Sequence, residues 1–394
     1  MFSHKIVDNL SKSSWIRAMF EEGEKLRKIH GADKVYDFSL GNPDMEPPLA
    51  VKEKLKDLVM DERPGKHSYM SNAGYNDVRA KVAAYLQEEK GVPLTYENII
   101  MTCGAAGGLN VVLKSLLNPG EEVLILSPYF VEYLFYVDNH GGKPVVVPTN
   151  PDTFEPDPHV LKDYITPKTK ALILNSPNNP TGVVYSEQTL KKIAQLLEDK
   201  EKEYNTAIFV ISDEPYDRIV YDGVQVPSLF RIFKNSIIVN SFSKSLALPG
   251  ERIGYIAVNS TIKDADVLIN AMVFCNRTLG FVNAPALMQK VIADTIDAEA
   301  NVEEYKRRRD LLYNHLTSLG FSCVKPQGAF YLFPKALIED DVEFVKRAVK
   351  YNLLLVPGTG FGYPGYFRIS YSVDPKMIEN SLPAFEALVK EFKA

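Results

Sequence analysis

The segment Ser241-Phe242-Ser243-Lys244, followed closely by Gly250-Glu251-Arg252-Ile253-Gly254, decides the fold expected for this chain. Apolar, strand-like runs lie on both sides of it, at 236–240 and 253–258. Lys244 is therefore expected in a turn between two buried strands. Burying an ammonium group is costly, so a lysine in such a place is usually paired or neutral. A neutral amine can form a Schiff base with a carbonyl compound, which makes Lys244 a candidate nucleophile.

Two other interpretations compete for Lys244. Most lysines are exposed loop residues. The pair Ser241 and Lys244 also matches the Ser-x-x-Lys motif of penicillin-binding serine enzymes. That motif is accompanied by Ser-Asp-Asn and Lys-Thr-Gly, and neither tripeptide occurs in the sequence. Lys244 therefore becomes a strong candidate only where other polar groups converge on it.

The composition limits the classes of function. The 394 residues, 45% hydrophobic and 24% charged, are typical of a globular protein with room for two domains. A net charge of −5 argues against nucleic acid or an anionic membrane as the main partner. The three cysteines (Cys103, Cys275, Cys323) and six histidines show no metal-ligand spacing, so no metal site is expected. Without a signal-peptide pattern or an apolar run of about 18 residues, we expect a cytoplasmic protein.

Strand-like and helical patterns alternate between residues 97 and 258. The strand-like runs lie at 98–101, 123–126, 145–147, 171–174, 207–211, 236–240 and 253–258. Several of them are continuously apolar, which favours a mostly parallel sheet covered by helices on both faces. Helical patterns separate them, most clearly at 109–117 and 187–197. These features predict a large doubly wound α/β domain over residues 45–285.

A second unit is expected from the two ends of the chain. Beyond residue 283 one long amphipathic helical pattern extends towards Leu319. Short strand-like runs follow at 329–333 and 367–370, and a last helix at 378–392. We therefore predict a smaller α+β domain made of residues 286–394 together with the N-terminal segment 1–44.

Ligands of open parallel sheets bind beyond the carboxyl ends of the strands, so the residues that follow each predicted strand form the candidate site. The small residues from Thr102 to Gly108 open a helix and suit a phosphate group. The later strands are followed by an aromatic ring, an amide-rich loop, an acid, a phenol and a lysine, namely Tyr129, residues 175–182, Asp213, Tyr216 and Lys244. Each of these alone could be an ordinary turn, cap or packing residue. Together they describe a site for pyridoxal 5′-phosphate, with a lysine for the Schiff base and a carboxylate for the pyridine nitrogen.

Three segments carry a resemblance to a known family. Asn178-Asn179-Pro180-Thr181-Gly182, Asp213-Glu214-Pro215-Tyr216 and the stretch from Ser241 to Gly254 resemble the class I and II aminotransferases of PLP fold type I, the aspartate aminotransferase superfamily. Order and spacing agree from Gly41 to Phe367-Arg368-Ile369-Ser370. The resemblance implies a transaminase that moves an amino group between an L-amino acid, aspartate or aromatic, and a 2-oxo acid such as 2-oxoglutarate.

The resemblance also implies a role for each cofactor-binding residue. Lys244 would hold the cofactor and act as general base, and Asp213 would keep the pyridine nitrogen protonated. Tyr216 and Asn179 would bind the phenolic oxygen of the cofactor, and Tyr129 would stack on its ring. The phosphate would be held by Gly104, Ala105, Ala106, Ser241, Ser243 and Arg252. A homodimer is implied, with Tyr69 reaching the partner's phosphate.

The substrate side chain stays open. Arg368 would bind the α-carboxylate with its two-pronged guanidinium, beside Gly41 and Asn179. Where the animal-type aspartate branch has a second arginine from the partner subunit, this chain has Asn283-Ala284-Pro285-Ala286, and the nearest cation is Arg277. A dicarboxylate preference is therefore in doubt. Two alternatives remain. One is a carbon–sulfur β-lyase on the same fold. The other is a PLP-dependent regulatory module, which carries a DNA-binding domain in front of the aminotransferase-like part; here Gly41 comes too early to leave room for such a domain.

Overall fold

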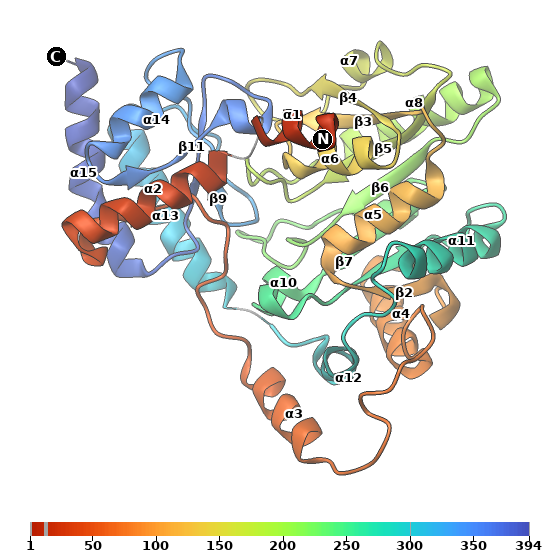
Figure 1. Ribbon diagram of the computed structural model, residues 1–394. Helices are drawn as coiled ribbons and strands as arrows, with labels where there is room; N and C mark the ends of the chain where they lie inside the picture. Colours follow the sequence, from red (N-terminus) through yellow and green to blue (C-terminus); the bar gives the residue numbers. More distant parts are fainter. Residues whose placement is uncertain (1, 12–14, 300, 394) are drawn as a thin grey trace.

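A seven-stranded sheet forms the centre of the larger part of the molecule (Figure 1). The computed structural model describes residues 2–11, 15–299 and 301–393. The strands, in the order β2-β8-β7-β6-β5-β3-β4, are β2 (Ile99–Thr102), β3 (Glu122–Ser127), β4 (Lys143–Pro148), β5 (Thr169–Asn175), β6 (Phe209–Asp213), β7 (Ser236–Ser241) and β8 (Gly254–Val258). Among them only β8 runs antiparallel to its neighbours, so the prediction of a mostly parallel sheet is confirmed.

Helices cover both faces of this sheet, as the continuous apolar runs predict. In β5, Ala171 and Ile173 face one side and Leu172 and Leu174 face the other. The first side packs against α5 (Gly104–Leu116), α6 (Glu132–Asn139) and α11 (Ala265–Thr278). The second side packs against α7 (Pro158–Lys162), α8 (Glu187–Tyr204) and α9 (Leu229–Ile232). Towards the β2 edge this second side is covered by α3 (Leu49–Met60) and α4 (Asn76–Lys90).

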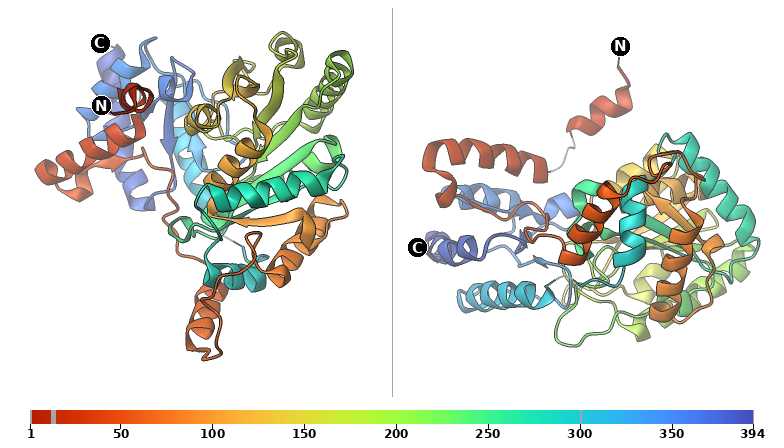
Figure 2. Two further views of the ribbon diagram at one scale, coloured as in Figure 1. Left: turned by 45° about the vertical axis from the view of Figure 1, so that its right-hand side comes forward. Right: turned by 90° about the horizontal axis from the view of Figure 1, so that it is seen from below.

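A smaller group of elements lies beside the large sheet. It contains the three-stranded antiparallel sheet β11-β12-β9, made of β9 (Tyr331–Leu332), β11 (Val356–Pro357) and β12 (Phe367–Ser370). β1 (Tyr36–Asp37) pairs in parallel with β10 (Leu353–Leu354), so the N-terminal segment joins the C-terminal part. The helices of this group are α2 (Trp15–His30), α13 (Val302–Ser318), α14 (Asp341–Val349) and α15 (Pro375–Lys393). Figure 2 shows α2, α13 and α15 together, apart from the helices of the large sheet.

The long helix expected from residue 283 to Leu319 is in fact two helices, α12 (Ala286–Thr295) and α13. The guanidinium group of Arg218 donates hydrogen bonds to the carbonyl oxygens of Ile296, Asp297 and Ala298 at 2.7, 3.2 and 2.8 Å, and it thereby satisfies the end of α12. Helix α12 packs on α3 and α4, within the core of the large sheet. We therefore propose that the smaller domain begins after α12, later than the boundary expected at residue 286.

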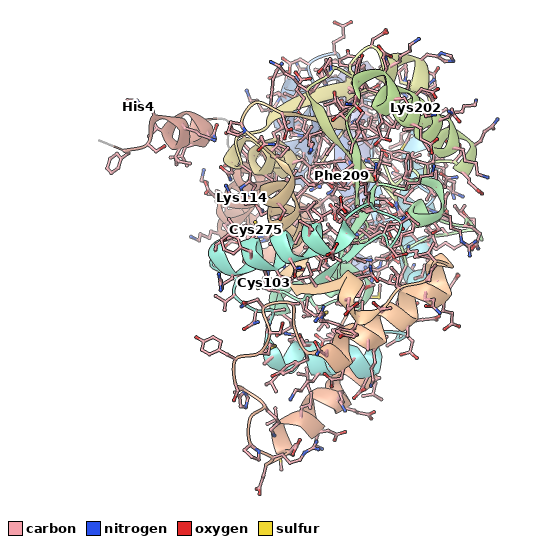
Figure 3. The ribbon with its side chains drawn as sticks, turned by 90° about the vertical axis from the view of Figure 1, so that its right-hand side faces the viewer. His4, Cys103, Lys114, Lys202, Phe209 and Cys275 are labelled. Carbon is pink, nitrogen blue, oxygen red and sulfur yellow. The ribbon has the colours of Figure 1, made fainter. Side chains whose placement is uncertain are left out.

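The amino-terminal helix α1 (His4–Ser11) stands out from the body of the fold, as Figure 3 shows at His4. Its Lys5 forms an ion pair with Asp138 of α6 at 2.7 Å.

Figure 3 also labels Cys103, which directly precedes α5, and Cys275 on α11; both thiols are free, as is that of Cys323. No helix within the described residues is long and apolar enough to span a membrane.

A buried ion pair fixes α4 against the end of β6. The Nζ atom of Lys90 lies 2.8 Å from Glu214 Oε2 and 3.5 Å from Asp217 Oδ2. The Ser212 hydroxyl donates to the other Glu214 oxygen at 2.7 Å, and the Asn240 amide donates to Asp217 at 3.2 Å. Burial lowers the pKa of Lys90, but the two carboxylates outweigh this and raise it above its ordinary value. The network therefore holds the ends of β6 and β7 in place.

Replacing Lys90 by methionine is expected to lower the free energy of unfolding by about 3–5 kcal/mol, because Glu214 would remain buried without its cation. Denaturation by urea at a fixed protein concentration measures this loss. The matched control is Lys191→Met, which breaks an exposed pair with Glu187 at 2.7 Å and is expected to cost about 0.5 kcal/mol or less. Equal losses in the two variants would contradict the prediction.

Candidate active site

A cavity lies at the carboxyl ends of the parallel strands, where open α/β sheets bind their ligands. Nine of its lining residues belong to the cofactor site predicted from the sequence: Ala105, Ala106, Asn179, Asp213, Tyr216, Ser241, Ser243, Lys244 and Arg252. Gly41 and Arg368, which were expected to bind the substrate, line it as well. Gly104, Tyr129 and Tyr69 do not. The residues expected at the strand ends, from Ala105 to Arg252, thus line one cavity, together with Gly41 and Arg368, which the resemblance implied.

Lys244 lies on the short helix α10 (Phe242–Ser245), directly after β7. Its Nζ atom donates a hydrogen bond to the carbonyl oxygen of Gly41 and lies 5.4 Å from the centre of the Phe330 ring. Burial, together with the nearby cations Arg368 and Arg252, lowers the pKa of Lys244 to about 8. A substantial fraction of this amine is therefore neutral near neutral pH, as carbonyl chemistry requires.

Asp213 ends β6 and has one satisfied and one free oxygen. Its Oδ2 accepts a hydrogen bond from the Tyr133 hydroxyl at 2.5 Å. Its Oδ1 is buried and has no hydrogen-bond partner within the described protein. Burial raises the pKa of Asp213 to about 7, which a hydrogen-bond donor or cation beside Oδ1 would reverse. The free oxygen therefore fits the protonated nitrogen of a pyridine ring.

Another group of lining residues suits an anion. It is formed by the first residues of α5, with their exposed N–H groups, and by the side chains of Ser241, Ser243 and Arg252. Gly104 contributes indirectly: its φ is +72°, and a Cβ atom there would lie 2.9 Å from the Arg252 guanidinium. A glycine is favoured because this φ lies in the left-handed region, which side chains rarely adopt. The hydroxyls, amides and cation together match a phosphate group.

Arg368, on β12, is held in the cavity wall from several sides. Its Nη1 donates to Asn179 Oδ1 at 3.0 Å, and its Nη2 donates to the Ser39 carbonyl oxygen at 2.6 Å. The guanidinium carbon lies 4.6 Å from the centre of the Tyr331 ring and 4.7 Å from that of Phe361. Its Nε is buried without a partner in the described residues. A cation fixed in this way suits the carboxylate of a substrate.

The aromatic ring chosen from the sequence is displaced by one residue. Tyr129 is packed against Gly362, where a Cβ atom would lie 2.5 Å from the tyrosine ring, and the cavity is lined by Phe130 instead. Phe130, and not Tyr129, is therefore the candidate for a ring that stacks on the cofactor. The sequence pattern favours Tyr129, the first ring after Ser127-Pro128, but the turn after β3 directs the second ring, Phe130, into the cavity. The spacing of Phe130, Tyr133 and Tyr136, which all line the cavity, is the helical signal that could have found them.

Tyr216 and Tyr331 form a pair that the sequence did not predict. Their hydroxyl oxygens lie 2.8 Å apart, and either can be the donor. Both side chains are buried and line the cavity. Burial raises the pKa of Tyr216 well above its ordinary value, and Tyr331 adds to this effect. Tyr331 also bounds the position of Gly41, where a Cβ atom would lie 1.9 Å from the tyrosine hydroxyl.

Two of the residues considered from the sequence lie outside the cavity and are exposed at the surface. Tyr69 is 91% exposed, at the tip of a loop held by bonds from Asn72 Nδ2 to the Val282 carbonyl at 2.9 Å and from Asn276 Nδ2 to the Asn72 carbonyl at 2.8 Å. Arg277 is exposed near the end of α11, with its guanidinium 5.4 Å from the ring centre of Phe274. Neither residue can act in the cavity of its own subunit. No group of three or more His, Cys, Asp or Glu side chains that could hold a metal ion occurs in the described part of the chain.

Comparison with known proteins places this site in a family. Residues 33–385 match the family model described as aminotransferase class I and II. A probable aspartate aminotransferase of Methanocaldococcus jannaschii is 36% identical, over 88% of this chain and 91% of that protein. Aromatic-amino-acid aminotransferase 2 of Thermococcus litoralis is 34% identical, over 96% of each. The crystal structure of an amino transferase from Eubacterium rectale has a TM-score of 0.97 and 42% identity over the whole of both chains.

The fold and these neighbours define an α/β enzyme of PLP fold type I. The chain belongs to the class I and II aminotransferase family, whose members depend on pyridoxal 5′-phosphate and act on amino acids and 2-oxo acids. The enzyme is an aminotransferase, as the sequence predicts, and the carbon–sulfur lyase alternative is not favoured, because the relatives are aminotransferases.

The lowered pKa of Lys244 can be tested on protein freed of cofactor. Labelling of this amine by an acylating reagent, followed by peptide mass spectrometry, is expected to have its midpoint near pH 8. In the Arg368→Gln variant the midpoint is expected to rise by about 0.5 pH, because a cation that disfavours the ammonium form is gone. Arg347→Gln, which removes a surface cation paired with Glu343, is the control and should leave the midpoint in place. A midpoint equal to that of an ordinary lysine would contradict the geometry.

Proposed function

We propose that the cavity binds pyridoxal 5′-phosphate through Lys244 and transfers the amino group of an L-amino acid, aspartate or aromatic, to a 2-oxo acid such as 2-oxoglutarate. The observation that carries the proposal is the free Oδ1 of Asp213, buried in the same cavity as the lowered-pKa amine of Lys244. When bound, the cofactor supplies an electron sink that acidifies the substrate Cα–H bond.

Each side chain has a separate task in this proposal. The carboxylate of Asp213 accepts a hydrogen bond from the pyridine nitrogen and keeps that nitrogen protonated. The Lys244 amine would act as the general base that takes the proton from the substrate Cα and would hold it for return as a general acid. The hydroxyl of Tyr216 donates to the phenolic oxygen of the cofactor. Phe130 covers one face of its ring.

The other end of the substrate is fixed by Arg368 and Asn179. The guanidinium binds the α-carboxylate, and its unpartnered Nε offers a further donor in the same plane. Orientation of the carboxylate sets which bond at Cα faces the lysine, so Arg368 contributes to rate as well as to affinity. At the phosphate end, Arg252 and the first residues of α5 anchor the cofactor.

The walls of the cavity favour an aromatic or apolar substrate side chain. Leu109, Phe130 and Tyr136 line it, and within the described residues the only arginines that line it are Arg252 and Arg368. Both are assigned to other groups, the phosphate and the α-carboxylate. A distal carboxylate would therefore need a cation from a second subunit, and Arg277 is exposed at the end of α11. Apolar pockets discriminate only modestly between side chains of similar size, so we expect a broad specificity.

A half-reaction screen tests the proposal. Protein loaded with pyridoxal 5′-phosphate is mixed with single L-amino acids, and conversion to the pyridoxamine form is followed by absorbance. Aromatic amino acids and aspartate are expected to convert the cofactor. Lys244→Ala is expected to slow conversion by at least about a thousandfold, because the general base is lost. Lys263→Ala, an exposed lysine, is the control. Release of pyruvate and ammonia from cysteine conjugates, without conversion, would contradict transamination.

We also propose that the enzyme is a cytoplasmic homodimer. The free cysteines suit a reducing compartment. Large apolar side chains are exposed just before and on α1, on α3 and on the loop that follows α3, namely Phe2, Ile6, Leu10, Leu49, Val59, Met60 and Tyr69. Such a surface is typical of a subunit interface. A fully exposed tyrosine on a braced loop is well placed to enter a neighbouring subunit's cavity and donate to the phosphate.

Subunit complementation tests this role of Tyr69. Tyr69→Ala and Lys244→Ala are each expected to have low activity as pure dimers. In a mixed dimer, one cavity combines Lys244 of the first subunit with Tyr69 of the second and is intact, while the other carries both substitutions. Unfolding and refolding the two variants together should therefore restore activity above that of either alone. If Tyr69 acts within its own subunit or not at all, the mixture will show only the average of the two.

A further inference from the structure

The hydroxyl pair of Tyr216 and Tyr331 connects two separate parts of the fold. Tyr216 follows β6 of the large sheet, and Tyr331 lies on β9 of the small sheet, beside β12, which carries Arg368. Their oxygen atoms are 2.8 Å apart and their ring centres 5.8 Å apart. Within the described residues, Tyr216 is the only hydrogen-bond partner of the Tyr331 hydroxyl. The contact is therefore specific to one phenol.

The surroundings of Tyr331 leave its hydroxyl little freedom. The ring is 2% exposed and lies against the guanidinium of Arg368, at 4.6 Å from ring centre to guanidinium carbon. The hydroxyl is so close to Gly41 that a side chain there would force the Tyr331 ring to shift. The Gly41 carbonyl in turn accepts the hydrogen bond from Lys244. The Tyr331 hydroxyl thus contacts both Tyr216 and the backbone of Gly41, whose carbonyl binds Lys244. The ring of Tyr331 packs against Arg368, the cation proposed to bind the substrate.

We propose that Tyr331 is a positioning residue that donates its hydroxyl hydrogen to Tyr216 and so directs the hydrogen of Tyr216 towards the cofactor. The inference rests on the proposed function of the cavity. A phenol has one hydrogen to donate and can accept others. If Tyr331 donates its hydrogen to the Tyr216 oxygen, the hydrogen of Tyr216 is free for the phenolic oxygen of pyridoxal 5′-phosphate.

Arg368 strengthens this arrangement. A cation over the face of an aromatic ring stabilises electron density on that ring, and it therefore makes the Tyr331 hydroxyl a better donor. Hydrogen bonds in a chain polarise one another, so a stronger donation to Tyr216 makes Tyr216 a stronger donor in turn. The phenolic oxygen of the cofactor, which carries negative charge, is stabilised as a result. In this way the residue that binds the substrate carboxylate influences the electronics of the cofactor through Tyr331.

Titration of the cofactor absorbance against pH tests the proposal, using the loaded wild type and the Tyr331→Phe variant. Phenylalanine keeps the ring against Arg368 and removes only the hydroxyl. We expect the pH midpoint of the colour change to rise by about 0.5–1, because the anionic oxygen is less stabilised. We expect kcat to fall several-fold, while KM for the amino acid changes less than about twofold, since Arg368 keeps its contacts. Tyr371→Phe is the matched control: this buried hydroxyl bonds to the Ala329 carbonyl at 3.2 Å and does not line the cavity.

A double-mutant cycle separates positioning from simple packing. If Tyr331 acts through Tyr216, then adding Tyr331→Phe to a Tyr216→Phe protein should leave the midpoint and kcat unchanged from Tyr216→Phe alone. Additive effects in the double variant, or a Tyr331→Phe midpoint equal to that of the wild type, would overturn the role of Tyr331. A wild-type protein that stays colourless with the cofactor would instead overturn the proposed function of the cavity.

Discussion

The cost of removing charge from water governs this structure. A lysine, an arginine and an aspartate share one cavity, and each of them would be more stable in solvent unless the protein compensates it. The compensation is incomplete for all three. Lys244 has a backbone carbonyl for a partner and a lowered pKa, Asp213 keeps one oxygen without a partner and has a raised pKa, and Arg368 keeps a free Nε. The groups left unsatisfied by the fold are the ones that a cofactor and a substrate would satisfy.

The buried pair of Lys90 and Glu214 shows that a buried charged group elsewhere in the fold can be fully compensated. Incomplete compensation is therefore a property of the cavity and not of every buried charge. Both networks lie at the end of β6, and Glu214 directly follows Asp213. Lys90 has two carboxylates, and its pKa is raised despite burial. Burial lowers the pKa of Lys244, and the two cations in its surroundings add to this effect. One lysine is thus kept as a permanent ion that braces the strands, while the other is kept ready to lose its proton.

The sequence predicted those parts of the molecule that depend on local pattern and on one topological rule. Continuous apolar runs indicated the buried strands, and the strand-end rule brought Asp213, Tyr216 and Lys244 to one edge of the sheet. It failed where distant parts of the chain decide the outcome. The break between α12 and α13 depends on Arg218, which is nearly 80 residues away, and no periodicity in the helical segment reports it. The choice of Phe130 over Tyr129 depends on the packing of Tyr129 against Gly362.

The same limit explains why Tyr331 was not among the predicted site residues. A strand residue in a short apolar run gives no sign of function, because the alternation of strand side chains is the same whether a residue faces a core or a cavity. Its importance arises from the register of the small sheet, which pairs Tyr331 with Ser370, two residues beyond Arg368 on β12. This register places the ring of Tyr331 against the guanidinium while the hydroxyl reaches Tyr216 of the large domain. The small sheet therefore contributes more than Arg368, the arginine proposed to bind the substrate. It also supplies the group proposed to orient a phenol at the cofactor, so the placement of the small sheet beside the large one bears on the proposed chemistry.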